Sequence, residues 1–468
     1  MSKESGANGK HPARTYAAYG QLALPLAIAD LPIDIYLTTF YGTDIGVSLA
    51  AMAWVILIAR LSDVVTDPLI GILSDRSSHW RWGRRKSWVL LGIPVKMLGI
   101  YFIFFAEPGQ ADAGYLLLWL MVLYLGWTMV TIPYGAWGAE LSGYYHERSR
   151  ITGWRTAFAF IGIFIASIAP LITGGGAGTK EGLVPVMQGI GLWAMIIFPL
   201  SAIVLMRFVP EPPVLSMTAG LTWAQGLRIA WHNGPFMRIW TASTIGRIGT
   251  AINQTVVLWF FGHAMALGEA AGLPLLSYLL AAILGAPIWV ILGGRISKHR
   301  ALVVAVVISI VIFASLLLVP KGDLFLSCLV LFLAGLGGSA SATLGQSIAA
   351  DVIDLDEMRA RTSRAGLLIA IWGMGQKGGA AFGYFIALMI LAYSGFDAHS
   401  TANSETALQG LTITYIIVPW FFYAASIVLF WNFPLTAERQ ARIRAIVERR
   451  AAKAQAAAAS PNAAAINS

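Results

Sequence analysis

Long apolar runs separated by short charged clusters constrain this chain more than any other feature. Runs such as Ala301–Val319 and Leu411–Phe433 are about 20 residues long, which is the length of a helix that spans a bilayer core, and they show no polar face at helical spacing. Charged residues make up 12% of the 468 residues, against about 25% in ordinary soluble chains. The pattern excludes a soluble globular protein and predicts an all-α polytopic membrane protein.

The apolar runs predict twelve transmembrane helices in two pseudo-symmetric bundles of six. A proline-containing segment with a possible short helix over 221–232 divides them, as in transporters built from repeats. The predicted spans are 16–42, 47–74, 86–106, 114–138, 151–173 and 184–208, then 237–264, 271–294, 300–319, 323–349, 364–394 and 410–432. The predicted domains are a cytoplasmic N-terminus (1–15), a first bundle (16–209), a cytoplasmic linker (210–235), a second bundle (236–433) and a cytoplasmic tail with a disordered end (434–468).

The loops between the predicted spans alternate in charge. One set carries most of the Lys and Arg residues, and the other set is nearly free of them. Because cytoplasmic loops carry the excess of basic residues, both termini are expected in the cytoplasm of a bacterium, with the chain in its inner membrane. This topology explains the net charge of +9 without a nucleic-acid partner. Cys328 is the one cysteine and the seven histidines are scattered, so we expect no cofactor and no enzyme activity.

Two aspartates inside the second predicted span require a special explanation. Asp63 and Asp67 are four residues apart, so they share one helix face at a separation of about 6 Å. Two carboxylates in a dry site must take up a proton, bind a cation or pair with a base. The pair is therefore a candidate cation-coupling site that would take either H⁺ or, as a bound metal ion, Na⁺. The alternative is a structural ion pair between Arg60 and Asp63.

The motifs that flank this span resemble those of known transporters. Gly71–Arg76 and Arg81–Lys86 resemble the signature loop of the major facilitator superfamily, which implies a cytoplasmic gate at Asp75, Arg76, Gly83 and Arg84. The segments Ala59–Pro68, Ile132–Tyr134, Ala350–Asp354 and Gly375–Gly379, with Arg155, are similar to the glycoside–pentoside–hexuronide:cation symporters. In the second half, Asp351 and Asp354 join the predicted gate.

The resemblance implies that Asp63 and Asp67 bind the coupling cation and that Thr128 lies near them. Thr131 stands where the best-known member of that family has an aspartate shared between the cation and sugar sites. One carboxylate fewer weakens Na⁺ coordination, while a proton needs only one well-placed carboxylate. The sequence therefore favours H⁺ over Na⁺, with Na⁺ retained as the rival.

The remaining polar and aromatic residues inside the spans are candidates for substrate binding. Arg155, Gln376 and Lys377 match family positions. Arg247 is either an anion clamp or the partner of a buried acid such as Asp30 or Asp34. The family has a functional aspartate in the helix of Asp30 and Asp34, and it aligns only loosely with them, with Asp30 first. Asn253 and Gln254 either line the cavity or bond neighbouring helices. Tyr134, Trp127 and Trp372 are the aromatic candidates.

These observations predict a secondary active symporter that couples H⁺ or Na⁺ entry to uptake of a sugar, a glycoside or an acidic sugar derivative by alternating access. The basic residues Arg155, Arg247 and Lys377 favour an acidic substrate. The alternative is a transporter of a lysolipid, another amphiphile or another organic anion. The expected partners are the lipid bilayer and the small solute, and the expected state is a monomer.

Overall fold

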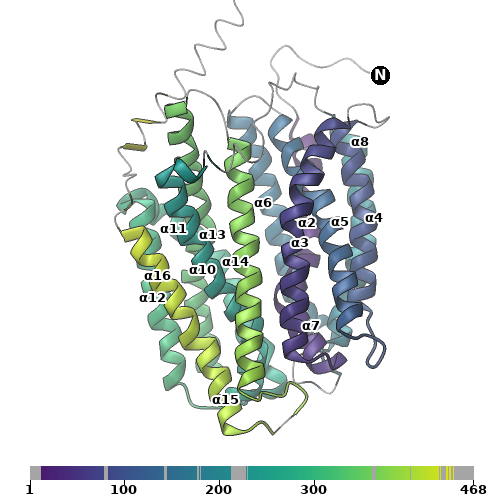
Figure 1. The fold of residues 1–468 in the computed structure, drawn as a ribbon, viewed down its shortest axis with the longest axis vertical. Coiled ribbons are helices and arrows are strands. Elements are labelled where there is room, and N and C mark those ends of the chain that lie inside the picture. The colour runs from purple at the N-terminus through teal and green to yellow at the C-terminus, as the bar shows by residue number, and fades with distance from the viewer. Residues whose placement is uncertain are drawn as a thin grey trace, which may run out of the picture.

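The structure, a computed structural model, is a bundle of long helices that run side by side (Figure 1). It describes residues 12–77, 83–141, 145–176, 179, 181–211, 228, 230–360, 365–400, 402–431, 433, 439, 440, 442, 443 and 446. Among these residues, nine helices are long and apolar enough to cross a membrane. Three other long helices, with 23, 26 and 29 residues, run beside these nine. The prediction of an all-α polytopic membrane protein is confirmed.

The N-terminal half contains the helices before the linker. They are α1 (Ala13–Gly20), α2 (Ala23–Thr39), the π-helical turn η1 (Phe40–Ile45), α3 (Leu49–Arg76), α4 (Arg84–Phe104), α5 (Ala113–Glu140), α6 (Tyr145–Ser167), α7 (Ala169–Thr173) and α8 (Val184–Phe208).

The C-terminal half follows the linker. Its elements are α10 (Gly234–Trp259), the π-helical turn η2 (Phe260–Ala264), η3 (Gly268–Ala271), α11 (Gly272–Ile296), α12 (Lys298–Ser315), η4 (Leu316–Leu318), α13 (Leu324–Ala360), α14 (Ala365–Tyr393), α15 (Glu405–Thr412), η5 (Ile413–Ile417) and α16 (Val418–Trp431).

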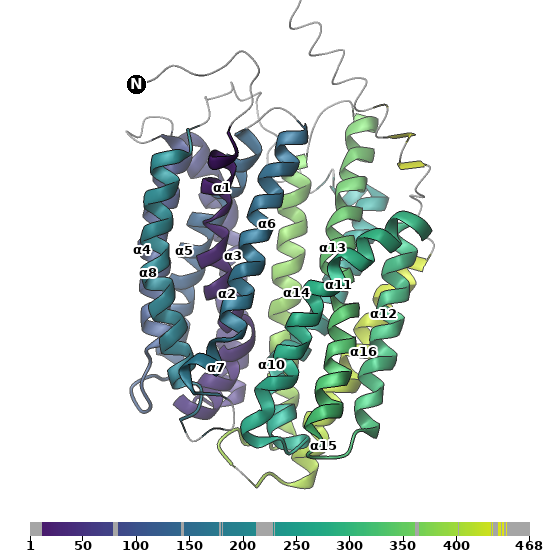
Figure 2. The same ribbon diagram turned by 180° about the vertical axis from the view of Figure 1, so that it is seen from behind.

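The two halves lie beside each other in both views (Figures 1 and 2). We call the end where α3 ends and α4 begins the terminal face, and the end that carries η1 and η2 the opposite face. At the opposite face the Trp259 indole N–H donates to the Thr43 hydroxyl at 2.9 Å, and the Thr38 hydroxyl donates to the Thr255 carbonyl at 3.0 Å. The first long helix of each half therefore ends in a π-helical turn, and these two ends bond to each other.

The predicted spans agree with the helices in order, and α8 has the predicted bounds. The largest difference is α13, which continues to Ala360 instead of ending near residue 349, so that Asp351 and Asp354 lie in its last turns rather than in a loop. α6 begins at Tyr145, before the predicted start at 151. Most of the linker and tail lies outside the described residues, although residues 230–232 are helical as predicted.

Glycines allow α4 and α5 to come into close contact. A side-chain carbon added at Gly126 of α5 would come within 2.6 Å of the Lys96 Cα of α4, and one at Gly99 of α4 within 2.6 Å of the Leu123 Cα of α5. The two helix backbones can pack this closely because small residues leave the room. This packing buries Lys96 completely.

We expect Gly126→Ala to destabilise the protein by about 1–3 kcal/mol, because the new methyl group meets backbone atoms that cannot move aside cheaply. The midpoint of thermal unfolding in detergent measures this effect. Gly135→Ala on the same helix is the matched control, because nothing lies within 4 Å of its added carbon. Equal midpoints for the two variants would contradict the packing assignment.

Candidate functional site

Helix α3 carries the two aspartates that the sequence singles out. Asp63 is 2% exposed and Asp67 is 17% exposed, and both face α14 of the other half. Their spacing of one helical turn puts both carboxylates on the same face of α3, as predicted.

A lysine from the C-terminal half lies between these carboxylates. The Lys377 ammonium on α14 contacts Asp67 at 2.6 and 2.9 Å and Asp63 at 3.2 Å, and it lies 4.3 Å from the centroid of the Trp127 ring on α5. Two carboxylates and an indole face are the surroundings that stabilise a cation. We call Asp63, Asp67 and Trp127 the cation cage. All three come from the N-terminal half, while the ammonium comes from the other half.

The two carboxylates of the cage differ in their hydrogen bonds. The Thr128 hydroxyl donates to Asp67 at 2.8 Å. Among the described residues, neither oxygen of Asp63 receives a hydrogen bond, although the Lys377 ammonium is within ion-pair distance. A buried carboxylate without a donor is costly while it is ionised, so Asp63 is the acid with most to gain from a proton or a cation.

A second cross-half contact involves Asp34 on α2. Its carboxylate accepts from Arg60 at 3.3 Å and from the Tyr384 hydroxyl at 2.9 Å, and the Arg247 guanidinium lies 3.7 Å away. Arg60 thus pairs with Asp34 and not with Asp63, which corrects the alternative of an Arg60–Asp63 ion pair.

Asp30 belongs to a third ion pair, with the buried Lys96, a residue that sequence reasoning missed. The Lys96 ammonium contacts the Asp30 carboxylate at 2.7 Å, and the Trp127 indole N–H donates to the other Asp30 oxygen at 3.1 Å. Lys96 lies within an apolar span, so the rule that flagged Asp63 would have flagged it too. Its partner could not be read from the sequence, because it is on a different helix.

These three clusters have complementary charges. Asp63 and Asp67 with Lys377 sum to −1, and Asp34 with Arg60 and Arg247 sums to +1. Asp30 with Lys96 sums to zero, so the eight groups together are neutral. The site therefore has a negative subsite and a positive subsite side by side.

A cavity of about 500 Å³ lies within the C-terminal half, next to the positive subsite. We call it the C-terminal chamber. Arg247, Gln254, Trp372 and Gln376 line it. Arg247 donates to the Gln254 side-chain oxygen at 2.7 Å.

Other predicted residues have mainly structural contacts. Asn253 lines the chamber but donates to the Tyr415 carbonyl and accepts from Tyr423, so it bonds neighbouring helices. Tyr134 is buried and exchanges hydrogen bonds with Tyr19, and the exposed Arg155 lies 5.7 Å from the Tyr134 ring centroid. The Thr131 hydroxyl donates to the Trp127 carbonyl one turn earlier, not to the cage.

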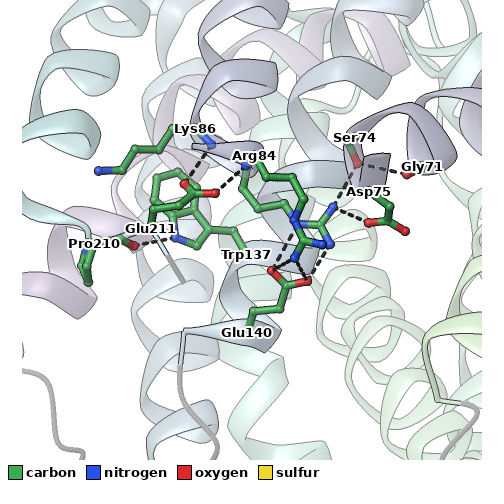
Figure 3. Close-up of polar contacts among 10 residues, drawn as sticks. Gly71, Ser74, Asp75, Arg84, Lys86, Trp137, Glu140, Pro210 and Glu211 are labelled. Carbon is green, nitrogen blue, oxygen red and sulfur yellow. Dashed lines mark hydrogen bonds and ion pairs between the residues drawn. The ribbon is translucent and has the colours of Figure 1, made fainter. Parts of the chain in front are cut away.

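Two of the predicted gate residues, Asp75 and Arg84, lie near each other where α3 ends and α4 begins (Figure 3). Glu140 accepts from Arg84 and Arg85, and Arg85 also pairs with Asp75 at 2.8 Å. The Glu211 carboxylate accepts from the backbone N–H of Arg85 at 2.6 Å and of Lys86 at 3.2 Å, which caps the start of α4.

Gly83 precedes this cap with a φ of +100°, and an added side-chain carbon would overlap Glu211. Arg76, the last residue of α3, is exposed, and Arg81 lies outside the described residues. In the other half Asp351 pairs with Lys298 at 2.6 Å, and Gln440 bonds both Asp351 and Asp354. Both gate regions thus join helix ends within a single half.

Opposite charges that meet between two membrane-spanning helical halves, beside a cavity in the C-terminal half, are typical of a membrane transporter. The profile of the family described as MFS/sugar transport protein matches residues 18–437, and the chain belongs to that family. The resemblance to the major facilitator superfamily is confirmed. A solved D-xylose-proton symporter has the same fold, with a TM-score of 0.61 at 13% identity, covering 90% of this chain and 97% of that one.

Two curated relatives match most of the chain. YagG of Escherichia coli K12, provisionally named a glycoside/cation symporter, is 26% identical, with 90% of this chain and 92% of the relative covered. The human sodium-dependent lysophosphatidylcholine symporter 1 is 21% identical, with 82% and 76% covered.

We expect Lys96→Met to destabilise the protein by about 1–3 kcal/mol, because the Asp30 carboxylate, which is 36% exposed, loses the cation that it contacts. Thermal unfolding in detergent measures the loss. The double variant Lys96→Met/Asp30→Asn removes both charges and should recover most of the stability. A double variant as unstable as Lys96→Met alone would show that the ion pair is not the cause.

Proposed function

We propose that this protein is a cation-coupled symporter of a glycoside-class solute, with the coupling cation held in the cage of Asp63, Asp67 and Trp127. The observation that carries the proposal is the Lys377 ammonium, which lies in that cage at 2.6–3.2 Å from both carboxylates. A site that binds the ammonium group of a lysine has the charge and the shape to bind a coupling cation. The glycoside/cation relative supports the same class of solute.

Lys377 explains how cation binding and the movement of the two halves are linked. It is on α14, so its ion pair with α3 ties the halves together at the level of the site. A proton or cation in the cage neutralises one of the two carboxylate charges, which weakens the attraction of the cage for Lys377. The cation thereby changes the relative free energies of the states in which the halves are apart or together, which is what coupling requires.

The available oxygen atoms favour a proton as the coupling ion. The cage offers two carboxylates, and Thr128 adds one hydroxyl, while Thr131 donates to its own helix. Hard metal ions such as Mg²⁺ and Ca²⁺ take about six oxygen ligands or more, whereas a proton needs one carboxylate. Asp63, which lacks a hydrogen-bond donor in the described structure, is the proposed proton acceptor. Na⁺ is the outcome that the ion test below distinguishes.

We further propose a bacterial inner-membrane location with the terminal face in the cytoplasm, as the basic loops indicate. The bonds between η1 and η2 close the opposite face, which would then be the outer gate. In this orientation the site opens inward. The protein acts as a monomer, because both halves of the site come from one chain.

We expect Asp63→Asn and Asp67→Asn to abolish solute accumulation against a gradient, since an amide neither takes up a proton nor attracts a cation. Uptake into proteoliposomes with an imposed ion gradient measures accumulation. Glu107→Gln, on an exposed loop of the opposite face, is the matched carboxylate-to-amide control. Accumulation by both cage variants at the control level would refute the cation site.

We expect a pH gradient, acidic outside, to drive uptake and an Na⁺ gradient at constant pH to have no effect. Thr128→Val should reduce the driven rate on the order of tenfold, because it removes the hydroxyl bonded to Asp67. Thr131→Val is the control, since its hydroxyl bonds only the Trp127 carbonyl. Uptake driven by Na⁺ alone would overturn the proposal of a proton as the coupling ion, but it would leave the assignment of the cage as the cation site intact.

A further inference from the structure

The C-terminal chamber has a charged entrance that neither the cation cage nor the packing explains. Arg247 lines the chamber and also faces Asp34 across the interface. Ile35, the neighbour of Asp34 on α2, is the one lining residue of the described set that comes from the N-terminal half. Arg247 therefore lies where the chamber meets the space between the halves.

The positive charge of Arg247 is incompletely balanced. Its nearest carboxylate oxygen, on Asp34, is 3.7 Å away, and the same carboxylate accepts from Arg60 at 3.3 Å and from Tyr384 at 2.9 Å. One carboxylate thus serves two guanidinium groups. The remaining partner of Arg247 is the neutral oxygen of Gln254. A partly buried cation with a charge surplus of one is a site for an anion.

The chamber behind Arg247 has mostly apolar walls. The apolar lining includes Leu275, Leu279, Val306, Phe313, Leu331 and Phe430. Polar side chains also line it, among them Tyr278, Ser309 and Ser339, but apolar atoms make up most of the exposed wall. A free sugar carries hydroxyls on every side and would place some of them against apolar wall, which costs binding free energy. An apolar group attached to a polar head fits these walls better.

We propose that the C-terminal chamber is a substrate subsite that takes the apolar group of an organic monoanion, whose acidic group binds Arg247. The proposal rests on the proposed function, because it assigns the solute that the cage drives. The acidic group replaces Asp34 as the partner of the surplus guanidinium. The apolar group fills the chamber between α10, α11, α12 and α13.

This assignment has an electrical consequence. The eight ionisable groups of the three clusters sum to zero, with −1 at the cage together with Lys377 and +1 at Asp34 together with Arg60 and Arg247. One proton neutralises the cage and one monoanion neutralises the positive subsite, so the loaded transporter carries no net charge across the membrane. A neutral solute moved with a proton would instead carry one positive charge per cycle, and its uptake would respond to the membrane potential.

The test uses the full chain in proteoliposomes with three probes: 4-nitrophenyl β-D-glucuronide, methyl β-D-glucuronide and 4-nitrophenyl β-D-glucoside. A pH gradient and a potassium–valinomycin potential are imposed separately. We expect the nitrophenyl glucuronide to be transported best, driven by the pH gradient and unaffected by an inside-negative potential. Preference for the neutral glucoside, or stimulation of glucuronide uptake by the potential, would overturn the anion assignment. Glucuronide uptake that responds to no ion gradient would instead refute the cation-coupled function.

Two pairs of variants locate the subsite. Arg247→Gln should lower transport of both glucuronides on the order of 10- to 100-fold, while Arg247→Lys keeps the charge and should retain most of it. Gly345 lines the chamber and nothing lies within 4 Å of its added carbon, so Gly345→Leu narrows the chamber without a clash. It should lower transport of the nitrophenyl glucuronide about tenfold more than that of the methyl glucuronide.

Gly294→Leu is the control for the chamber, because Gly294 also has open space and does not line it. Equal effects of Gly345→Leu on the two glucuronides would refute the chamber as the apolar subsite. Equal transport by Arg247→Gln and wild type, with both folded by thermal unfolding, would refute the role of Arg247.

Discussion

The ion pair between Lys377 and the two aspartates of α3 is the interaction on which the rest of the site depends. A charge left alone in the hydrocarbon region costs a few kcal/mol or more, so each buried acid must have a base within reach. Lys377 and Asp67 meet this requirement only when α14 lies against α3. Asp34 and Arg247 impose the same condition on α2 and α10. Charge pairing therefore decides which helices of the two halves face each other.

The distribution of charge between neighbouring clusters connects binding to movement. The cage is negative by one charge and the Asp34 cluster is positive by one, while the Asp30–Lys96 pair is balanced. A cation and an anion can each replace a protein group at one cluster without leaving net charge in the membrane. Because each replaced group belongs to a contact between the halves, binding of both solutes loosens that interface at the site.

Packing away from the site keeps these charges in position. Gly126 lets α4 approach α5 around Lys96, which pairs with Asp30, and Trp127, the next residue, contacts both Asp30 and Lys377. At the terminal face Glu140 and Glu211 hold the start of α4, and at the opposite face η1 bonds to the end of α10.

The sequence by itself determined the membrane class and the order of the helices, and it identified Asp63 and Asp67 as candidate site residues. Hydrophobic runs and i, i+4 spacing are local properties, so they can be read along the chain. Only the tertiary structure decided the partners: Lys377 lies 310 residues from Asp67 in sequence, and Arg60 pairs with Asp34 instead of Asp63 one turn away. The C-terminal chamber was equally out of reach, because its walls come from several helices. A charged residue inside an apolar run indicates that a partner is needed, but the packing of the helices determines which residue that partner is.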